Sequence, residues 1–271
     1  MTCRVTSFAS GSSGNALLIQ SSNTALLVDC GVTQRSLERH LHHAGLEPAN
    51  LSAILLTHEH HDHAMSVGPF ARRYGIPVVA NGPTFAALGQ ELRKVTLYEI
   101  GISGAITIGD CAVQSFPVPH DAAAPVGYTI HAPDQCVGVA IDLGSWDETV
   151  LAGLVPADLV IIEANHDRER LRLAPYQWPI KQRIFSPLGH LDNIEAGSIL
   201  AKLGADGRRR TAWLAHLSEQ ANSPTIALKV VKSALALAHV SYINVHALPR
   251  HASMAWASDE HLQQMELFAG L

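Results

Sequence analysis

The feature that most constrains this chain is a cluster of histidines and one aspartate directly after a short apolar run. After Ala53 to Leu56, the chain reads Thr57-His58-Glu59-His60-His61-Asp62-His63. Side chains alternate along an extended strand, so His58 and His60 point the same way. Where the chain turns into the next helix, Asp62 and His63 can present a second set of donors. Imidazole nitrogens and a carboxylate suit zinc or another first-row divalent metal. The pattern therefore predicts a metal site at the end of a buried strand. An exposed histidine-rich turn is the plain alternative.

Strand and helix patterns alternate on both sides of this cluster. Apolar runs predict strands at 5–9, 16–20, 25–29, 53–56, 76–80, 158–162, 211–215 and 242–245, and a mostly β region at 105–141. Amphipathic runs predict helices at 33–44, 65–74, 193–203 and 224–239, with others after Pro83 and from Trp146. Such interleaving indicates sheets covered by helices. With 271 residues and no repeat or linker, one domain covering 1–271 is expected.

Composition narrows the class of protein. A net charge of −5 argues against a broad basic face tracking a duplex, although bound cations can supply positive charge locally. The four cysteines are widely separated, which is typical of reduced, buried thiols. No apolar stretch reaches the length of a membrane span, and the first residues lack a signal-peptide pattern. A cytoplasmic protein without a membrane partner is predicted.

Three further residues are candidate ligands on weaker grounds. His216 follows an apolar strand and so repeats the placement of the main cluster. His246 also follows a predicted strand and is the rival for the same place. His120 has as much reason to be an ordinary surface or core histidine, and Asp142 alone could be a turn residue after a strand.

The motif Thr-His-x-His-x-Asp-His, with Asp29-Cys30-Gly31 upstream, resembles the metallo-β-lactamase superfamily. The resemblance extends along the chain through the segments 10–15 (Ser-Gly-Ser-Ser-Gly-Asn), 120–122, 125–128, 142–144, 163–167, 189–191 and 216–218. Their order resembles the YycJ/WalJ/VicX branch, small enzymes linked to 5′-to-3′ exonuclease activity, and the later motifs resemble ribonuclease Z. The implied fold is an α/β, αββα sandwich of two mixed β-sheets flanked by helices.

The resemblance also implies a ligand set for two divalent ions, zinc or manganese, with iron possible. In it His58, His60 and His120 bind the first ion, Asp62, His63 and His216 bind the second, and Asp142 bridges them. A hydroxide held between the ions would be the nucleophile, with Asp62 also counted as catalytic. Asp29 and Asp121 are expected to contact and orient the ligands.

Glu163, His166 and His190 are expected to handle protons. A carboxylate beside a histidine fixes its tautomer, and a resembling pair in ribonuclease Z suggests that Glu163 orients His190 to protonate the leaving oxygen. Alternatively, Glu163 caps a helix and His166 is solvated. The branch usually has serine where this chain has Asp192, a residue also suited to cap a helix.

Phosphate contacts are predicted from backbone and basic groups. The loop residues Ser12, Ser13, Gly14 and Asn15 suit an anion-binding nest, although turn chemistry alone favours a plain hairpin turn. The run 208–210 (Arg-Arg-Arg) is a second candidate, with simple solvation as its alternative. Lys181 and Arg183 are comparable candidates for holding a nucleic-acid backbone.

Together these features predict a metal-dependent phosphodiesterase on nucleic acid, with DNA favoured over RNA, acting as a 5′-to-3′ exonuclease. A thioester or lactone hydrolase of the same fold is the alternative, because those enzymes share the metal ligands. A non-catalytic metal-binding protein is a third reading, disfavoured because no ligand is missing.

Overall fold

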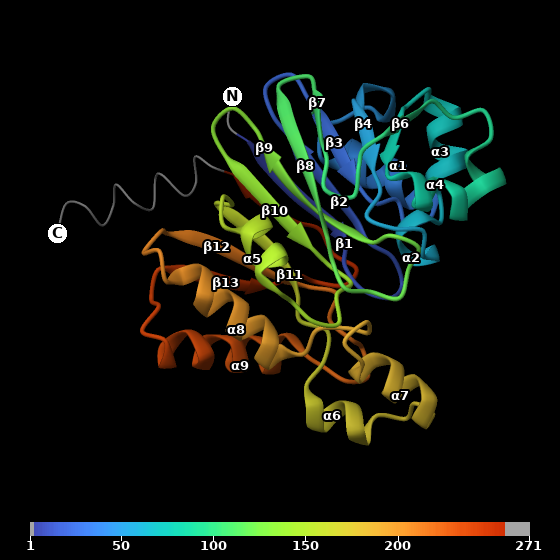
Figure 1. Cartoon of the computed structure of the whole chain (residues 1–271). Helices are drawn as coiled ribbons and strands as arrows, with labels where there is room; N and C mark the ends of the chain where they lie inside the picture. The colour runs from blue at the N-terminus through green and yellow to red at the C-terminus, as the bar shows by residue number, and fades with distance from the viewer. Residues whose placement is uncertain (1–2, 258–271) are drawn as a thin grey trace.

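Two seven-stranded sheets packed face to face, with helices on their outer faces, make up the computed structural model (Figure 1), which describes residues 3–257. The first sheet contains, in spatial order, β14 (Met254–Ala257), β1 (Arg4–Ala9), β2 (Ala16–Gln20), β3 (Ala25–Val28), β4 (Ala53–Leu55), β5 (Val78–Ala80) and β6 (Leu97–Glu99). The second contains β13 (Ile243–Ala247), β12 (Arg210–Ala215), β11 (Leu159–Glu163), β10 (Cys136–Ala140), β9 (Val126–His131), β8 (Cys111–Pro117) and β7 (Ala105–Ile108). The predicted sandwich of two mixed sheets is confirmed.

Each sheet carries its own layer of helices. The first half of the chain supplies α1 (Gln34–His43), α2 (His61–Ala64), α3 (Val67–Tyr74) and α4 (Gly82–Leu88), with the 3-10 turns η1 (Pro48–Asn50) and η2 (Gly89–Leu92). The second half supplies α5 (Glu148–Leu154), α6 (Arg168–Leu173), α7 (Trp178–Phe185), α8 (Asn193–Gly204) and α9 (Pro224–Leu237). Figure 1 shows α6 and α7 standing apart from the other helices, at one rim of the sandwich.

Parallel strands form one side of each sheet, out to the edge strands β6 and β13. In the first sheet β3, β4, β5 and β6 are parallel, and in the second β10, β11, β12 and β13 are parallel. Every residue of β10, β11 and β12 is buried, because helices cover one face and the other sheet covers the second. The continuous apolar runs that predicted these strands follow from this burial.

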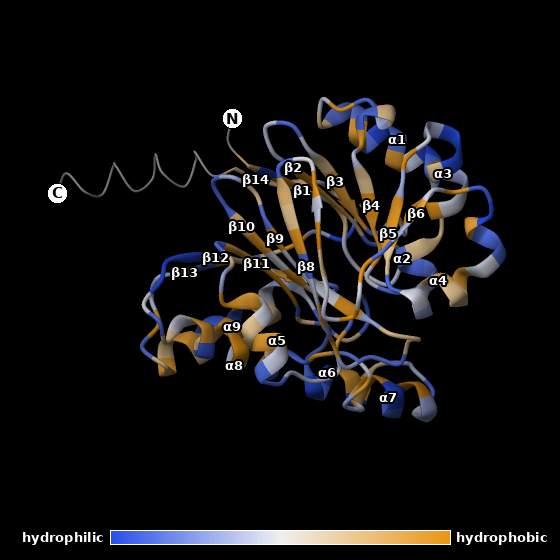
Figure 2. Cartoon of the chain, turned by 45° about the horizontal axis from the view of Figure 1, so that its top comes forward, coloured by the Kyte–Doolittle hydropathy of each residue, from blue (hydrophilic) through white to orange (hydrophobic). Residues whose placement is uncertain are grey.

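Three apolar clusters hold the layers together. The first lies between the sheets and includes Ile19, Tyr128 and Trp213. The other two lie beneath the helices of each sheet. In Figure 2 the hydrophobic colouring follows the strands, while polar colouring is more frequent on the helices. The hydroxyl of Tyr128 in the second sheet donates to the Leu56 carbonyl at 2.5 Å, so the sheets are fastened directly beside the histidine cluster.

Some elements differ from the sequence predictions. The helix expected from residue 65 is preceded by α2, which begins at His61 and contains Asp62 and His63. Strands β6 and β14 and helices α6 and α7 were not predicted. Strand β6 has only three residues and α7 only eight, and neither buries any of them, so neither gives the long apolar pattern from which an element is predicted.

The arginine run 208–210 is not a uniformly solvated or phosphate-binding patch, and that prediction is wrong for Arg210. Its side chain is fully buried and donates to the carbonyls of Ala157 and Leu203 and to the carboxylate of Asp206. Arg208 pairs with Asp158. Two of the three arginines therefore fasten the start of β12 to the preceding loops. Within residues 3–257, no helix is long and apolar enough to cross a membrane.

Candidate dinuclear metal centre

Five strand ends meet at one rim of the sandwich and place most of the candidate side chains. Asp29 follows β3, His58 follows β4, Asp142 follows β10, Glu163 ends β11 and His216 follows β12. Three of these residues, Asp29, Asp142 and His216, have positive φ angles of 61°, 55° and 53°. Left-handed backbone is costly for residues other than glycine and concentrates at functional sites. The chain therefore turns sharply where these side chains enter the common space.

The structure brings the predicted ligands together in two groups. His58, His60, His120 and Asp142 form one, and Asp62, His63, Asp142 and His216 form the other. Within each group the candidate ligand atoms lie within 4.8 Å of one another. Asp142 is the member common to both. His246, the sequence-level rival of His216, lies on β13 opposite Trp213 and belongs to neither group.

Two histidines of the cluster are held by hydrogen bonds at Nδ1. His63 Nδ1 donates to Asp29 Oδ2 at 2.7 Å, and His58 Nδ1 lies 3.0 Å from Thr57 Oγ1. The Thr57 hydroxyl in turn donates to Asp29 at 2.9 Å. A partner on Nδ1 fixes the tautomer and leaves Nε2 with a lone pair for a metal. Asp29 therefore lies beside the cluster and orients the ring of His63.

His120 and His216 are oriented in the same way. His120 Nδ1 donates to the carbonyl of Gly189 at 2.8 Å, and His216 Nδ1 donates to Glu163 Oε1 at 2.8 Å. Asn165 Nδ2 also donates to the His216 carbonyl at 2.9 Å. Both Nε2 atoms point back toward the ligand groups. The roles of Thr57, Asn165 and the Gly189 carbonyl were not found from the sequence, because these contacts carry no motif signal.

Unpartnered buried atoms test whether this arrangement fits metal ions. His58 Nε2, His216 Nε2 and Asp142 Oδ1 are buried and have no hydrogen-bond partner within the described residues. Buried polar atoms without a partner are rare and costly. Nitrogen and carboxylate donors suit a divalent first-row ion, and such an ion would satisfy the three atoms. The donor set fits the metal centre that the sequence predicts.

Asp142 lies where a bridging ligand would have to lie. Its Oδ2 is 2.9 Å from His63 Nε2, 3.5 Å from His58 Nε2 and 3.8 Å from His120 Nε2. One carboxylate oxygen thus faces histidines of both groups. This oxygen is the only described ligand atom placed between them at such distances.

The electrostatics of the cluster favour cations. Burial raises the pKa of Asp142, but the charges of His216 and His63 outweigh burial and hold it well below its usual range. Burial lowers the pKa of His63, yet the charges of Asp142 and Asp29 raise it to about 10. The buried carboxylates thus favour the protonated form of these histidines. Protons and metal ions therefore compete for the same ring nitrogens.

A third group contains Asp142, Glu163, His190 and His216. Glu163 links its two histidines by hydrogen bonds. Glu163 Oε1 is 2.9 Å from His190 Nδ1 and 2.8 Å from His216 Nδ1, so the carboxylate already accepts from both rings. Glu163 Oε2 accepts from the backbone amides of Leu143 and Leu191. Burial lowers the pKa of His190, but Glu163 and Asp142 raise it to about 9.

His166 lies outside this network. Its ring is buried, neither nitrogen has a hydrogen-bond partner within the described residues, and burial lowers its pKa to about 4. The structure therefore joins Glu163 to His190 but not to His166. Asp192 caps α8 and pairs with Arg168 at 2.5 Å, so its carboxylate charge is balanced.

The serine-rich loop is partly used within the protein. The amides of Gly14 and Asn15 donate to the carbonyls of Gly11 and Asp62, and Asn15 Nδ2 lies 3.0 Å from His63 Nε2. These two residues therefore support the cluster rather than form an open nest. The exposed Ser12 and Ser13 remain the phosphate-binding candidates.

Asp121 and the spacer residue Glu59 hold the loop that carries His120. Arg183 of α7 makes two hydrogen bonds to the Asp121 carboxylate, at 2.5 and 2.7 Å, and Asp121 Oδ1 lies 3.4 Å from His120 Nε2. Glu59 accepts from the Ala123 amide at 2.7 Å, while His61 is exposed. Arg183 was predicted only as a phosphate contact, and its bond to Asp121 was missed.

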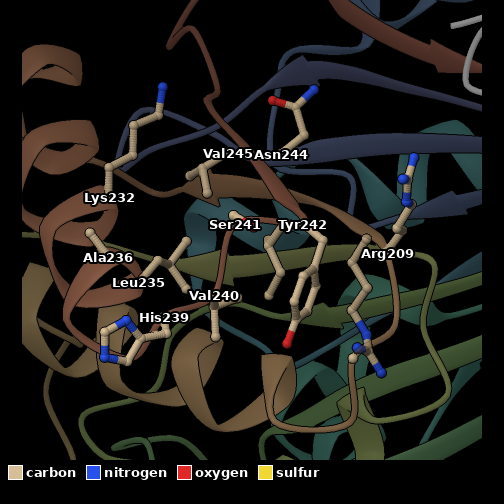
Figure 3. Close-up of a pocket in the computed structure, with 13 residues that line it drawn as sticks. Arg209, Lys232, Leu235, Ala236, His239, Val240, Ser241, Tyr242, Asn244 and Val245 are labelled. Carbon is tan, nitrogen blue, oxygen red and sulfur yellow. The ribbon is translucent and has the colours of Figure 1, made fainter. Parts of the chain in front are cut away.

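A hollow of about 1020 Å³ on the described surface is not at this centre. Figure 3 shows it between α9 and β13, lined by Arg209, Lys232, His239 and Tyr242 among others. These residues lie near the beginnings of β12 and β13, whereas His216 follows the end of β12. The metal cluster is recognised by its chemistry and not by cavity size.

Comparison with known proteins agrees with this geometry. Residues 24–217 match the family model described as the beta-lactamase superfamily domain. The chain is 39% identical over 239 residues, 85% of this chain and 87% of the relative, to exodeoxyribonuclease WalJ of Streptococcus pneumoniae serotype 2. It is 35% identical over 230 residues, 84% and 87% of the two chains, to exodeoxyribonuclease YycJ of Bacillus anthracis. The solved structure of the metallo-beta-lactamase fold protein YhfI from Bacillus subtilis matches with a TM-score of 0.72 at 22% identity, covering 95% of this chain and all of that one.

Proposed function

Because this chain belongs to the metallo-β-lactamase superfamily, in the branch of the exodeoxyribonucleases WalJ and YycJ, we propose that it is a metal-dependent exonuclease that shortens DNA from the 5′ end. The observation that carries the proposal is the double ligand group around Asp142, with its unpartnered buried donor atoms. Two groups that share one carboxylate suit a pair of ions.

We assign His58, His60 and His120 to one ion, Asp62, His63 and His216 to the other, and Asp142 to both. Zinc and manganese are the ions we favour, since imidazole and carboxylate ligands accept either. When bound, the ions supply an activated water and positive charge to the phosphate. Asp29 and Glu163 keep His63 and His216 in the tautomers that this binding requires.

The chain's own residues provide the proton transfer. Glu163 Oε1 accepts the Nδ1 proton of His190 and so presents the opposite nitrogen, Nε2, away from the carboxylate. His190 is only partly exposed, at the edge of the cluster. A proton held at Nε2 can be given to the oxygen that leaves phosphorus. General acid help of this kind contributes about a hundred- to ten-thousandfold to a rate.

DNA as the preferred polymer and a cytoplasmic location are further parts of the proposal. The names of the two WalJ and YycJ relatives support DNA. The exposed Ser12 and Ser13 are the loop residues that we assign to phosphate contact.

The test is digestion of end-labelled single- and double-stranded DNA and RNA, with manganese or zinc supplied. Wild-type protein is expected to shorten DNA progressively from the 5′ end. Asp62→Ala should abolish cleavage by removing a ligand, and His190→Ala should slow it about a hundredfold or more. His61→Ala, which changes an exposed histidine of the same segment, should behave as wild type.

The results of this digestion distinguish the proposed DNA exonuclease from the alternative functions. Cleavage of RNA alone would overturn the preference for DNA. If no polymer is cut but a thioester or lactone is hydrolysed, the protein is a small-molecule hydrolase of the same fold. If His190→Ala cleaves at the wild-type rate, the proton-transfer role is wrong.

A further inference from the structure

The segment 168–188, which contains α6 and α7, exposes large apolar side chains that the rest of the fold does not cover. Among these, Leu173 is 85% exposed, Trp178 62%, Leu188 51%, Ile180 45% and Phe185 38%. Helix α7 buries none of its eight residues. The segment is attached through a small cluster around Leu171 and Ala221. Figure 2 shows hydrophobic and polar colouring side by side on α7.

The same segment is strongly basic. Its 21 residues contain five Lys and Arg and one Glu, a net charge of +4 in a chain whose overall charge is −5. The basic side chains are Arg168, Arg170, Arg172, Lys181 and Arg183, and those of Arg172 and Arg183 are about half exposed or more even where they pair with a carboxylate. Apolar and aromatic groups interleaved with cations are typical of surfaces that bind single-stranded nucleic acid.

The end of this segment is fastened to the catalytic cluster. The His190 amide donates to the Ile184 carbonyl at 3.1 Å, and the Asp121 amide donates to the Leu188 carbonyl at 3.1 Å. The Phe185 ring stands edge-on to the ring of His166, with 5.4 Å between centroids. The segment therefore lies next to the proposed active site.

Two aromatic residues of α7 share one side of the helix. Trp178 and Phe185 are seven residues apart, close to two full turns, so their side chains project in nearly the same direction. The rise between them is about 10 Å. Lys181 lies between them in the sequence, three residues after Trp178, and its ammonium donates to the Arg172 carbonyl at 2.5 Å. A strand of nucleic acid lying along this side would meet an aromatic ring, a cation and a second ring.

We propose that α7 binds the unpaired nucleotides of single-stranded DNA next to the bond to be cleaved, with Trp178 and Phe185 stacking on bases and Lys181 near the backbone. The proposal rests on the proposed nuclease function and specifies its substrate as a strand with unpaired bases. In a duplex the base faces are stacked on one another and hidden from such rings. A paired substrate must fray before α7 can hold it.

Binding to the metal-free protein tests this without relying on catalysis. The protein is treated with EDTA and titrated with a fluorescently labelled, 5′-phosphorylated ten-nucleotide oligothymidylate, and both label anisotropy and tryptophan emission are followed. Because stacking on one aromatic ring contributes about five- to a hundredfold to affinity, Trp178→Ala should weaken binding at least fivefold. Trp178→Phe keeps a ring, so it should retain most of the affinity while losing the emission change.

The matched control is Leu237→Ala, which removes an equally exposed apolar side chain, 83% exposed, on α9 outside the segment. It should bind as wild type does. A blunt, fully paired duplex should lose less than twofold in affinity with Trp178→Ala. Circular dichroism establishes that each variant is folded.

Different results would overturn the role of α7 and the nuclease function. If Trp178→Ala binds the oligonucleotide as tightly as wild type while wild type degrades DNA, the role of α7 is wrong and the nuclease function stands. If Trp178→Ala instead changes the sedimentation of the protein alone, α7 is a contact between copies of the chain, which also overturns the proposal. If wild type neither binds nor cleaves any nucleic acid with metal supplied, the function itself is wrong.

Discussion

At the scale of single residues, Asp142 is the side chain on which both ligand groups depend. It is buried, it has a left-handed backbone conformation, and one of its oxygens faces histidines of both groups. A carboxylate removed from water is retained at such a position only when cations surround it. The neighbouring Asp29 and His216 share the same backbone conformation. Three residues of the site thus adopt a left-handed backbone conformation that is unfavourable for residues other than glycine.

Asp142→Asn should leave the fold intact and remove most of the metal. Asparagine tolerates a positive φ and has the same shape, but it lacks the negative charge that offsets two cations. We expect about two ions per chain in wild type and fewer than one in Asp142→Asn, measured by plasma mass spectrometry after dialysis.

His216→Ala is the matched comparison, because His216 belongs to one group only. It should retain about one ion. Full metal content in Asp142→Asn would contradict the bridging assignment.

At the scale of elements, the turn after β10 and the segment before α8 approach so closely that only glycine fits at 144. A Cβ added to Gly144 would lie 2.3 Å from the Gly189 nitrogen and 2.5 Å from the Pro187 oxygen. Both are backbone atoms, so the segment that carries His190 would have to shift. This contact therefore sets the position of His190, the proposed proton-transfer group, relative to Asp142.

Gly144→Ala should reduce the rate of DNA cleavage about a hundredfold, because misplacement of a catalytic group by about 1 Å can cost that much. Steady-state cleavage rates on the same labelled oligonucleotide provide the measurement. Gly101→Ala is the control, since a Cβ there meets its nearest neighbour at an ordinary 3.6 Å. Cleavage at the wild-type rate in Gly144→Ala would show that the segment can move without consequence.

Elements also show what the sequence could and could not predict. The buried parallel strands were predicted from continuous apolar runs, and the cluster His58 to His63 from its ligand spacing, whereas His120 and Asp142 entered the candidate set through the family resemblance. The orientation of His120 by the Gly189 carbonyl was not predicted, because it joins segments 69 residues apart. Helix α7 was missed because its apolar residues, Trp178 and Phe185 among them, span only eight positions, a pattern too short to distinguish a helix from a loop.

At the scale of the whole molecule, the metal centre joins the two halves of the chain. His58, His60, Asp62 and His63 come from the first sheet and its helices, whereas His120, Asp142 and His216 follow strands of the second. The core between the sheets also draws on both halves. We propose on these grounds that residues 1–271 form one domain.

One domain joined in this way should unfold in a single thermal transition, and metal should raise its midpoint. A ligand that binds only the folded state at a hundred times its dissociation constant stabilises by about 2.7 kcal/mol. Differential scanning calorimetry with EDTA, and then with manganese or zinc, measures the shift. Asp142→Asn should show little shift, and two separate transitions in wild type would contradict the single domain.

The pairing of β1 with β14, the last strand within residues 3–257, has a consequence for synthesis on the ribosome. Strand β1 lies between β2 and β14, and Arg4 to Ser7 pair with residues 254–257. During translation, the outer edge of β1 therefore has no partner until residues 254–257 have been made. Until then that edge presents unpaired amides and carbonyls to any neighbouring nascent chain. Synthesis of residues 254–257, and not the emergence of the ligands, is the event that closes this edge of β1.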